Sequence, residues 1–313
     1  MTSRTNAIKA FLLLAATAFS ACGNYSNEDL DFELALPQDG DLDAKLPQAL
    51  TLDNSAEYYK LTRQVVTAFN GGATALTSLV DHVRSYPPTS RNGGERTWGP
   101  FADDKHSGWQ MRVVMVRSAD PSAPAPAFVI SYEIDLRNTV QSGSSFFTFM
   151  NGQYASSGSA RHGQGQMHLA VQTARDAGYP VDDFGDLAQL DLTYNTLSYP
   201  ITVDMVIANV PTANSPGATY DYTENADGSG QLDFDWMVAA VPGGAGPTNV
   251  TFASRWLGSG AGRADAYVPG LAGNTLVGTD CWGPDTLADY EWRWNGQGNS
   301  GSADLCVFST AVF

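Results

Sequence analysis

Apolar and polar residues alternate in run after run from about Trp98 to the C-terminus, and this pattern constrains the fold more than any other feature of the chain. Alternation with a period of two indicates strands that bury one face. The clearest runs are residues 109–115, 128–136, 201–207, 232–238, 250–256, 264–268 and 290–294. Clusters of Gly, Pro, Asn and Asp separate them, and NADGSG at 225–230 is typical of a hairpin turn. We count about eleven or twelve strands and predict a mainly β fold with one long antiparallel sheet.

Helical spacing of apolar residues is clear in one region, ahead of the strands. Ser55 can cap a helix, and apolar residues recur at helical spacing over residues 58–69. The NGG sequence at 70–72 predicts a break, after which a second apolar stripe runs over 76–83 and ends before Pro87. A sheet of this length must curl into a half-barrel or barrel. We therefore expect one or two N-terminal helices to cover its concave face.

The N-terminus has the composition of a secretory signal peptide. Arg4 and Lys9 precede an apolar stretch over residues 10–18 that is interrupted by one threonine. This stretch of about nine residues is too short to cross a bilayer, which takes roughly 20. A basic start, a short apolar run and small residues after it predict a signal peptide over residues 1–21.

The end of this stretch carries a motif that ends at a cysteine. Phe19, Ser20, Ala21 and Cys22 resemble the lipobox of bacterial lipoproteins, with Phe19 in place of the usual Leu. The resemblance implies that the Cys22 thiol receives a diacylglycerol, that cleavage follows Ala21 and that the new amino terminus is acylated, which gives stable membrane anchoring. Gly23, where an Asp would favour the inner membrane, implies the outer membrane, on its periplasmic face or the cell surface. The alternative is an ordinary signal peptidase site beside a cysteine.

Acidic residues are dense and aromatic residues are few between the motif and the first expected helix. This composition predicts a flexible tether over residues 22–54, with a reach of about 30 Å. A single domain of helices and antiparallel sheet would then occupy residues 55–313.

The sequence contains three cysteines, one in the lipobox-like motif and two near the C-terminus. If Cys22 is acylated, Cys281 and Cys306 remain as a pair, and in an oxidising compartment we expect them to form a disulfide. The loop that they close is about 25 residues long, so the bond would add roughly 3 kcal/mol of stability. The pair supports export without reference to the N-terminus.

The net charge of −16 argues against nucleic acid as a partner, because phosphates attract Lys and Arg. It also argues against an electrostatic hold on anionic lipid. The expected partners are the membrane, through the lipid anchor, and an apolar ligand or a glycan.

Residues that could carry chemistry do not form a recognisable constellation, so we expect no catalytic residues, no metal site and no cofactor. His162 and His168 share a strand face, but six residues of strand hold them about 20 Å apart. Asp233 and Asp235 lie roughly 7 Å apart, a spacing found in inverting glycoside hydrolases. Two acids at this spacing are also common on the solvent-exposed face of a strand, where they have no catalytic role. No nucleophile elbow or phosphate-binding loop is present. A hydrolase therefore remains a third hypothesis.

The first functional hypothesis is a non-enzymatic protein that binds an acyl chain or another apolar ligand in the concave sheet. Its lining would include Trp109, Met111, Phe128, Ile130 and Met205. The second is a structural or adhesive surface lipoprotein whose aromatic residues contact glycans or a protein. The C-terminal aromatic cluster consists of Trp282, Tyr290, Trp292 and Trp294.

The order of helices first and a long antiparallel meander after them resembles the half-barrel carrier and receptor of the bacterial Lol system. It is also similar to myxobacterial lipoproteins of unassigned role. This resemblance covers residues 55–313 and implies a half-barrel that holds an acyl chain.

Overall fold

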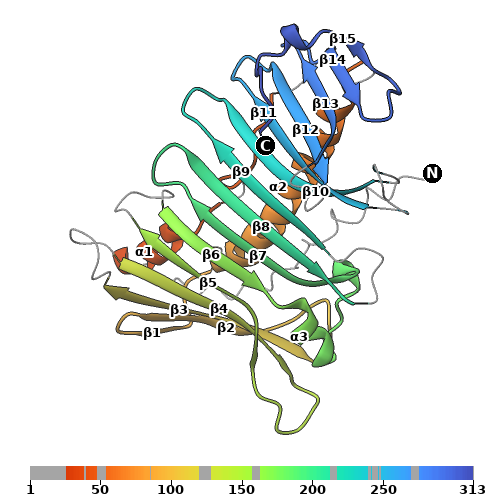
Figure 1. Ribbon diagram of the computed structural model, residues 1–313. Coiled ribbons are helices and arrows are strands. Elements are labelled where there is room, and N and C mark those ends of the chain that lie inside the picture. The colour runs from red at the N-terminus through yellow and green to blue at the C-terminus, as the bar shows by residue number, and fades with distance from the viewer. Residues whose placement is uncertain are drawn as a thin grey trace. The chain divides into compact units, whose positions relative to one another are not determined.

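One antiparallel sheet makes up most of the chain. The structure, a computed structural model, describes residues 26–38, 40–47, 54–84, 86–119, 128–156, 163–211, 217–238, 241, 246, 248–268 and 275–312. Fifteen strands follow one another in the sheet in chain order, and the first and last strands are its two edges (Figure 1). The predicted mainly β fold with one long antiparallel sheet and N-terminal helices is confirmed, with a few more strands than the pattern indicated.

The elements have the following bounds. The helices are α1 (Asn27–Ala35), α2 (Glu57–Arg84), α3 (Val171–Asp176) and the short 3-10 helices η2 (Asp182–Phe184) and η3 (Ala303–Leu305). The strands are β1 (Ser90–Asn92), β2 (Glu95–Ala102), β3 (Trp109–Ala119), β4 (Phe128–Asn138), β5 (Phe147–Ser156), β6 (Gly163–Leu169), β7 (Leu187–Asn195), β8 (Ile201–Asn209), β9 (Gly217–Glu224), β10 (Gly230–Val238), β11 (Thr248–Trp256), β12 (Gly262–Val268), β13 (Thr275–Trp282), β14 (Ala288–Arg293) and β15 (Ser300–Gly301).

The chain divides into two compact units. The first contains Met1–Pro37, Leu76–Asp191 and Ile207–Pro216, and the second contains Gln38–Ala75, Leu192–Val206 and Gly217–Phe313. Each unit is described by itself below.

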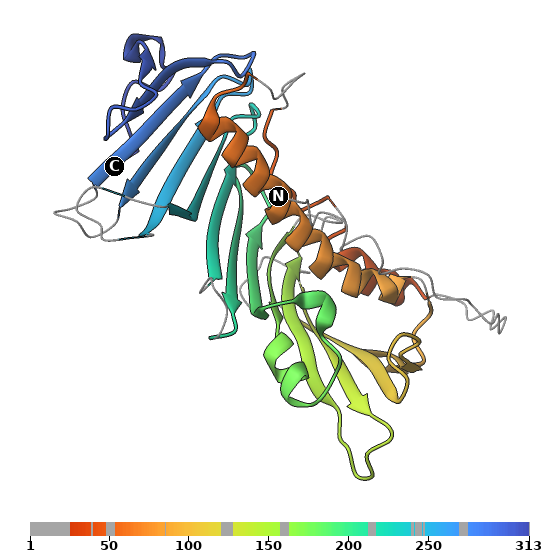
Figure 2. The same ribbon diagram turned by 90° about the vertical axis from the view of Figure 1, so that its right-hand side faces the viewer.

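In the second unit, the first part of α2 lies against the strands (Figure 2). Its contacts are largely aromatic: Tyr58 meets Phe252 edge to face at 4.9 Å between ring centroids, and Tyr59 meets Trp282 at 5.6 Å. Polar contacts within this layer include the hydroxyls of Thr62 and Ser254, 2.5 Å apart, and the Asp280 carboxylate, which accepts from the N–H of Tyr58 at 2.8 Å. Such close ring contacts and the burial of these side chains mean that this face of the sheet is a packed core.

The predicted break at 70–72 was wrong, because α2 continues through it as one helix of 28 residues. Asn70 accepts a hydrogen bond from the backbone N–H of Ala44 at 2.8 Å and donates one to its carbonyl at 3.1 Å. Phe69 and Ala73, on either side of the glycines, are buried. Glycine costs about 1 kcal/mol in a helix interior, and these tertiary contacts outweigh that cost.

The predicted flexible tether was also wrong for the described residues between 26 and 47. Residues 27–35 form α1, whose Phe32 is fully buried in the first unit. Residues 40–47 belong to the second unit, where Leu42 is buried and the Pro47 carbonyl accepts a hydrogen bond from Tyr59 at 2.7 Å. An acidic composition predicts disorder when the acids lack partners, but Glu28, Asp29 and Asp31 of α1 have arginine partners.

Candidate functional site

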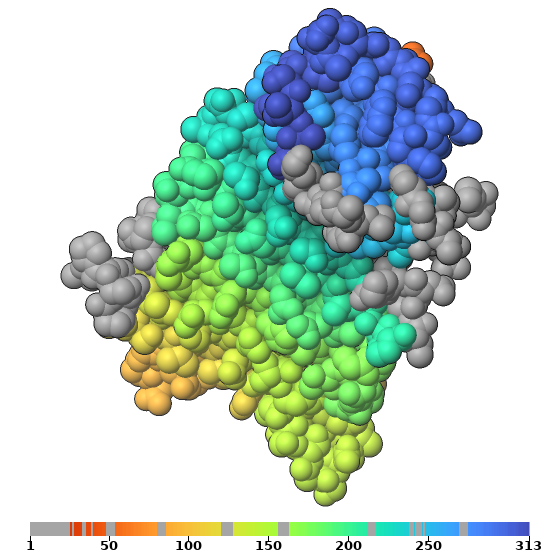
Figure 3. Space-filling model, in the orientation of Figure 1, coloured from red at the N-terminus to blue at the C-terminus, as the bar shows by residue number. Residues whose placement is uncertain are grey.

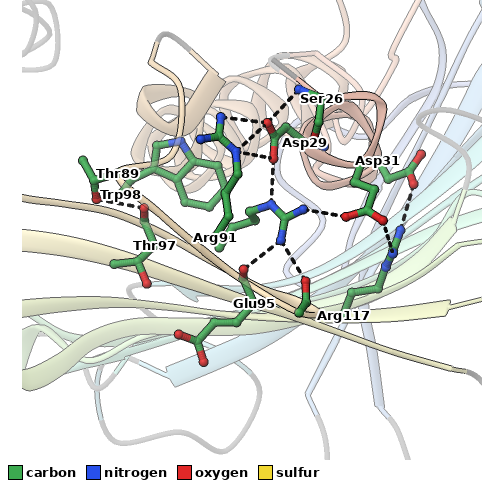
Figure 4. A network of polar contacts seen from close by, with 12 residues as sticks. Ser26, Asp29, Asp31, Thr89, Arg91, Glu95, Thr97, Trp98 and Arg117 are labelled. Carbon is green, nitrogen blue, oxygen red and sulfur yellow. Dashed lines mark hydrogen bonds and ion pairs between the residues drawn. The ribbon is translucent and has the colours of Figure 1, made fainter. Parts of the chain in front are cut away.

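A polar cluster of the first unit attaches α1 to strands β1–β3 (Figure 4). Ser26 caps the helix: its hydroxyl accepts from the N–H of Asp29 at 3.2 Å, and the Asp29 carboxylate accepts from the N–H of Ser26 at 2.9 Å. The same carboxylate accepts from Arg96 Nε at 2.7 Å and from Arg91 Nε and Nη2, each at 3.0 Å. We call Ser26, Asp29, Arg91 and Arg96 the N-terminal clasp.

Burial makes the clasp a strong interaction. The side chain of Asp29 is 0% exposed and that of Arg96 is 3% exposed. Burial alone would raise the pKa of Asp29, but the hydrogen bonds from Arg91, from Ser26 and from Arg96 together hold it far below its usual range. Asp29 is therefore fully ionised at neutral pH, and removing it would leave the buried Arg96 without its main counterion.

Two further acids of α1 also meet arginines. Glu28 contacts Arg96 at 2.8 Å, and Asp31 contacts Arg117 at 2.8 Å. The guanidinium groups of Arg96 and Arg117 lie 5.1 and 5.7 Å from the ring centroid of Phe32. The first turns of α1 thus place three carboxylates against three arginines, around one aromatic ring.

The C-terminal segment is attached to the second unit by a covalent bond. Cys281 and Cys306 form a disulfide with Cα atoms 5.3 Å apart, which confirms the expected pairing. Beyond it, the carbonyl of Phe308 accepts from Arg263 Nη1 at 3.0 Å, and that of Thr310 accepts from Arg255 Nη2 at 2.6 Å. The segment, dark blue in Figure 3, lies on the strand surface. Arg263, to which it bonds, is buried.

The five residues predicted to line an apolar pocket lie mostly in the core. Ile130 and Met205 are fully buried and Trp109 is nearly so, with its ring 5.1 Å from that of Tyr179. Met111 and Phe128 are half-buried. Ligand binding by these residues stays a prediction.

Two hollows in the first unit are lined by other, more polar residues. One has a volume of about 120 Å³ and is lined by His106, Tyr179, Pro180, Asp182, Asp183 and Phe184. The other, of about 410 Å³, is lined by Gln172, Arg175, Gly185, Asp186, Val210 and Pro211. Neither includes any of the five predicted lining residues.

The smaller hollow contains an oriented histidine. His106 Nδ1 lies 2.9 Å from Asp103 Oδ2 and 3.0 Å from the Tyr179 oxygen, and Tyr179 donates to the same carboxylate at 2.6 Å. Burial would raise the pKa of Asp103, but the hydrogen bonds from Tyr179 and His106 lower it. A carboxylate at Nδ1 favours the tautomer with Nε2 unprotonated, an arrangement suited to accepting a proton or a hydrogen bond. The lining residues of this hollow include no serine or cysteine nucleophile.

The other polar residues considered from the sequence do not come together as a metal site. His162 lies outside the described residues, and His168 contacts Asp191 at 2.6 Å. Within the described part of the chain, no group of three His, Cys, Asp or Glu side chains could hold a metal ion.

The acidic pair on β10 faces other polar side chains. Asp233 lies opposite Asp221 in the β9–β10 register, and Asp235 accepts from the Thr251 hydroxyl at 2.8 Å. Burial, followed by the charge of Asp221, raises the pKa of Asp233 to about 6, while the hydrogen bond from Gln231 and the charge of Arg255 oppose the rise. Neither hollow described above includes this pair.

Sequence reasoning missed both the N-terminal clasp and the Asp103–His106–Tyr179 cluster. The clasp left one signal: Ser26 followed by Asp29 has the spacing of a capping box. Asp103 and His106 are close in sequence, but Tyr179 is more than 70 residues away, and only the fold brings it to them.

No protein-family model, curated protein or solved structure matches the chain. The helices that the structure describes include none that is both long enough and apolar enough to cross a membrane.

Proposed function

We propose that the protein is an exported, non-enzymatic lipoprotein, anchored in the cell envelope through acylated Cys22, whose β-sheet units make contacts with partners through their surface. The observation that carries the proposal is the distribution of the three thiols. Cys281 and Cys306 form a disulfide, as in an oxidising compartment, and this leaves Cys22 of the lipobox-like motif as the cysteine open to acylation.

Surface contact is favoured over an internal cavity by the packing of the second unit. There α2 fills the apolar face of the strands with ring contacts of 4.9 and 5.6 Å. Several aromatic side chains of this unit remain on the outside: Tyr199 is 51% exposed, Trp294 42% and Trp236 37%. Exposed flat rings of this kind suit the faces of glycans or a protein partner.

Acylation is tested by metabolic labelling. The parent chain and the Cys22→Ser variant are expressed in a bacterial host with an alkyne analogue of palmitate, and their partition into detergent is measured. We expect the parent to take up label and enter the detergent phase, and the variant to do neither. Cys306→Ser, which removes another cysteine, should keep the label. Equal labelling of the parent and Cys22→Ser would refute the proposal.

The second candidate function is binding of an apolar ligand by the first unit. The partial exposure of Met111 and Phe128 favours it, because these two of the five predicted residues could meet a ligand without unpacking the core. Native mass spectrometry of the chain without residues 1–22, purified in the absence of detergent, tests it. A co-purifying lipid that is lost in a Met111→Lys variant would support this candidate. A mass equal to that of the protein alone would argue against it.

A further inference from the structure

We infer that the N-terminal clasp makes the surface around Ser26 and strand β1 the face that the first unit turns toward the lipid bilayer. The inference rests on the proposed acylation of Cys22. Its partner is the surface of the membrane that holds the anchor, and its elements are Ser26, Asp29, Arg91 and Arg96.

Chain length gives the first step. Three residues separate Cys22 from Ser26, so four chain steps join them and their Cα atoms lie within about 14 Å of each other, whatever the conformation between them. A free tether over residues 22–54 would have reached about 30 Å on average and more when stretched. Ser26 is hydrogen-bonded to Asp29, and Asp29 is hydrogen-bonded to Arg91 on the edge strand β1. A lipid on Cys22 must therefore lie close to β1.

The burial of the clasp gives the second step. Arg96, 3% exposed, is held at the Asp29 carboxylate and also donates to the carbonyls of Gly93 and Glu95, at 2.9 Å each. α1 has only nine residues, too few to be stable as an isolated helix. These contacts to β1 and β2 therefore keep α1 in place, and with it the point at which the anchor leaves the folded unit (Figure 4).

Charge gives the third step. The chain as a whole carries −16, and an acidic surface is repelled by anionic lipid. Near the start of the described chain, however, Glu28, Asp29 and Asp31 all form ion pairs, and together these pairs engage three arginines. Strand β1 next to them is exposed along its length, and its Arg91 pairs with Asp29 at 3.0 Å. These three acids and three arginines balance in charge, so they add little to the electrostatic cost of approaching lipid headgroups.

The test compares two positions of the first unit in the acylated, full-length protein. Asn92 lies in β1, beside the clasp. Val140, 82% exposed, follows the end of β4. In the sheet register, Arg96 of the clasp lies opposite Met115, and Met115 lies opposite Tyr132 of β4. The end of β4 is six residues beyond Tyr132. Val140 is thus roughly 20 Å from the clasp along the strands. With Cys22 acylated and the other two cysteines bonded, Asn92→Cys or Val140→Cys adds one free thiol for a fluorophore.

The labelled proteins are placed in vesicles of phosphatidylethanolamine and phosphatidylglycerol that contain a lipid with a nitroxide on its headgroup. We expect the label at 92 to be quenched at least threefold more than the label at 140. Asp29→Ala should remove most of this difference, and Arg91→Gln, which leaves the Asp29–Arg96 pair, should reduce it in part. Asp31→Ala, on the same helix but in an exposed pair, should keep the label at 92 the more strongly quenched of the two. Circular dichroism checks that each variant keeps its sheet.

Equal quenching at 92 and 140 would overturn the inference, and so would a difference that persists in a folded Asp29→Ala variant. Labelled palmitate and flotation with vesicles are measured on the same samples. A protein that takes up no palmitate refutes the proposed function. An acylated, vesicle-bound protein with equal quenching refutes this inference alone.

Discussion

The two ends of the described chain are fastened to their units by different chemistry. At the N-terminal end, α1 is held by ion pairs, with Asp29 between Arg91 and Arg96. At the C-terminal end, the segment after η3 is held by the Cys281–Cys306 disulfide, and arginine hydrogen bonds to two backbone carbonyls add to it. Both ends depend on arginine, but only the second is covalent.

This difference determines how each end can be released. A buried ion pair depends on both partners and on pH, whereas a disulfide depends on the redox state of the compartment. In the proposed cell-envelope location, the C-terminal attachment would be permanent. The N-terminal attachment could open without breaking a bond, which would lengthen the connection to the anchor.

The largest effect is expected at the N-terminal end. Asp29→Ala should lower the free energy of opening α1 by about 3–5 kcal/mol, because it leaves the buried Arg96 without its main counterion. Amide hydrogen exchange over residues 27–35 measures this opening. Protection equal to that of the parent would show that apolar contacts such as those of Phe32 hold the helix instead.

At the C-terminal end, Cys306→Ser should lower the free energy of unfolding of the second unit by about 3 kcal/mol. The disulfide closes a loop with a sequence separation of 25, and opening it restores freedom to the unfolded chain. Urea unfolding with and without reductant measures the change. Reductant should destabilise the parent, and it should have no effect on Cys306→Ser.

A fall in pH should release the N-terminal attachment but not the C-terminal one. The folded pKa of Asp29 lies below its unfolded value of about 3.8, so its stabilising contribution is complete above that value and is lost as the pH falls through the folded pKa. We expect α1 to remain protected from pH 7 to pH 5 and to open as the pH falls below 4, while the disulfide keeps the C-terminal segment attached. Hydrogen exchange across this range, corrected for the intrinsic rate, measures both. Opening of α1 near pH 6 would show that another group controls it.

The sequence predicted what depends on local pattern. The alternation over 109–115 and 128–136 predicted β3 and β4, because a strand with one buried face must alternate. The disulfide was predictable because two cysteines remain once Cys22 is assigned to the lipid, and because an oxidising compartment was expected.

The errors share one physical cause, which is a tertiary partner far away in the sequence. Asn70 is helical because its amide bonds to Ala44, 26 residues earlier. α1 is ordered because Asp29 meets arginines more than 60 residues later. Neither partner can be located from local composition. The glycine pair after Asn70 therefore wrongly predicts a helix break, and the acidic stretch that contains α1 wrongly predicts a flexible tether.

The smallest effect is expected for the exposed neighbour of the clasp. Asp31 pairs with Arg117 at 2.8 Å, the same length as a clasp contact, but its side chain is 44% exposed against 0% for Asp29. Water screens the exposed pair and solvates either partner when the other is removed, so Asp31→Ala should change the opening free energy of α1 by about 0–1 kcal/mol. The same exchange experiment measures it. If Asp31→Ala opened α1 as much as Asp29→Ala, the summed charge of the helix, rather than the buried pair, would hold the N-terminal end.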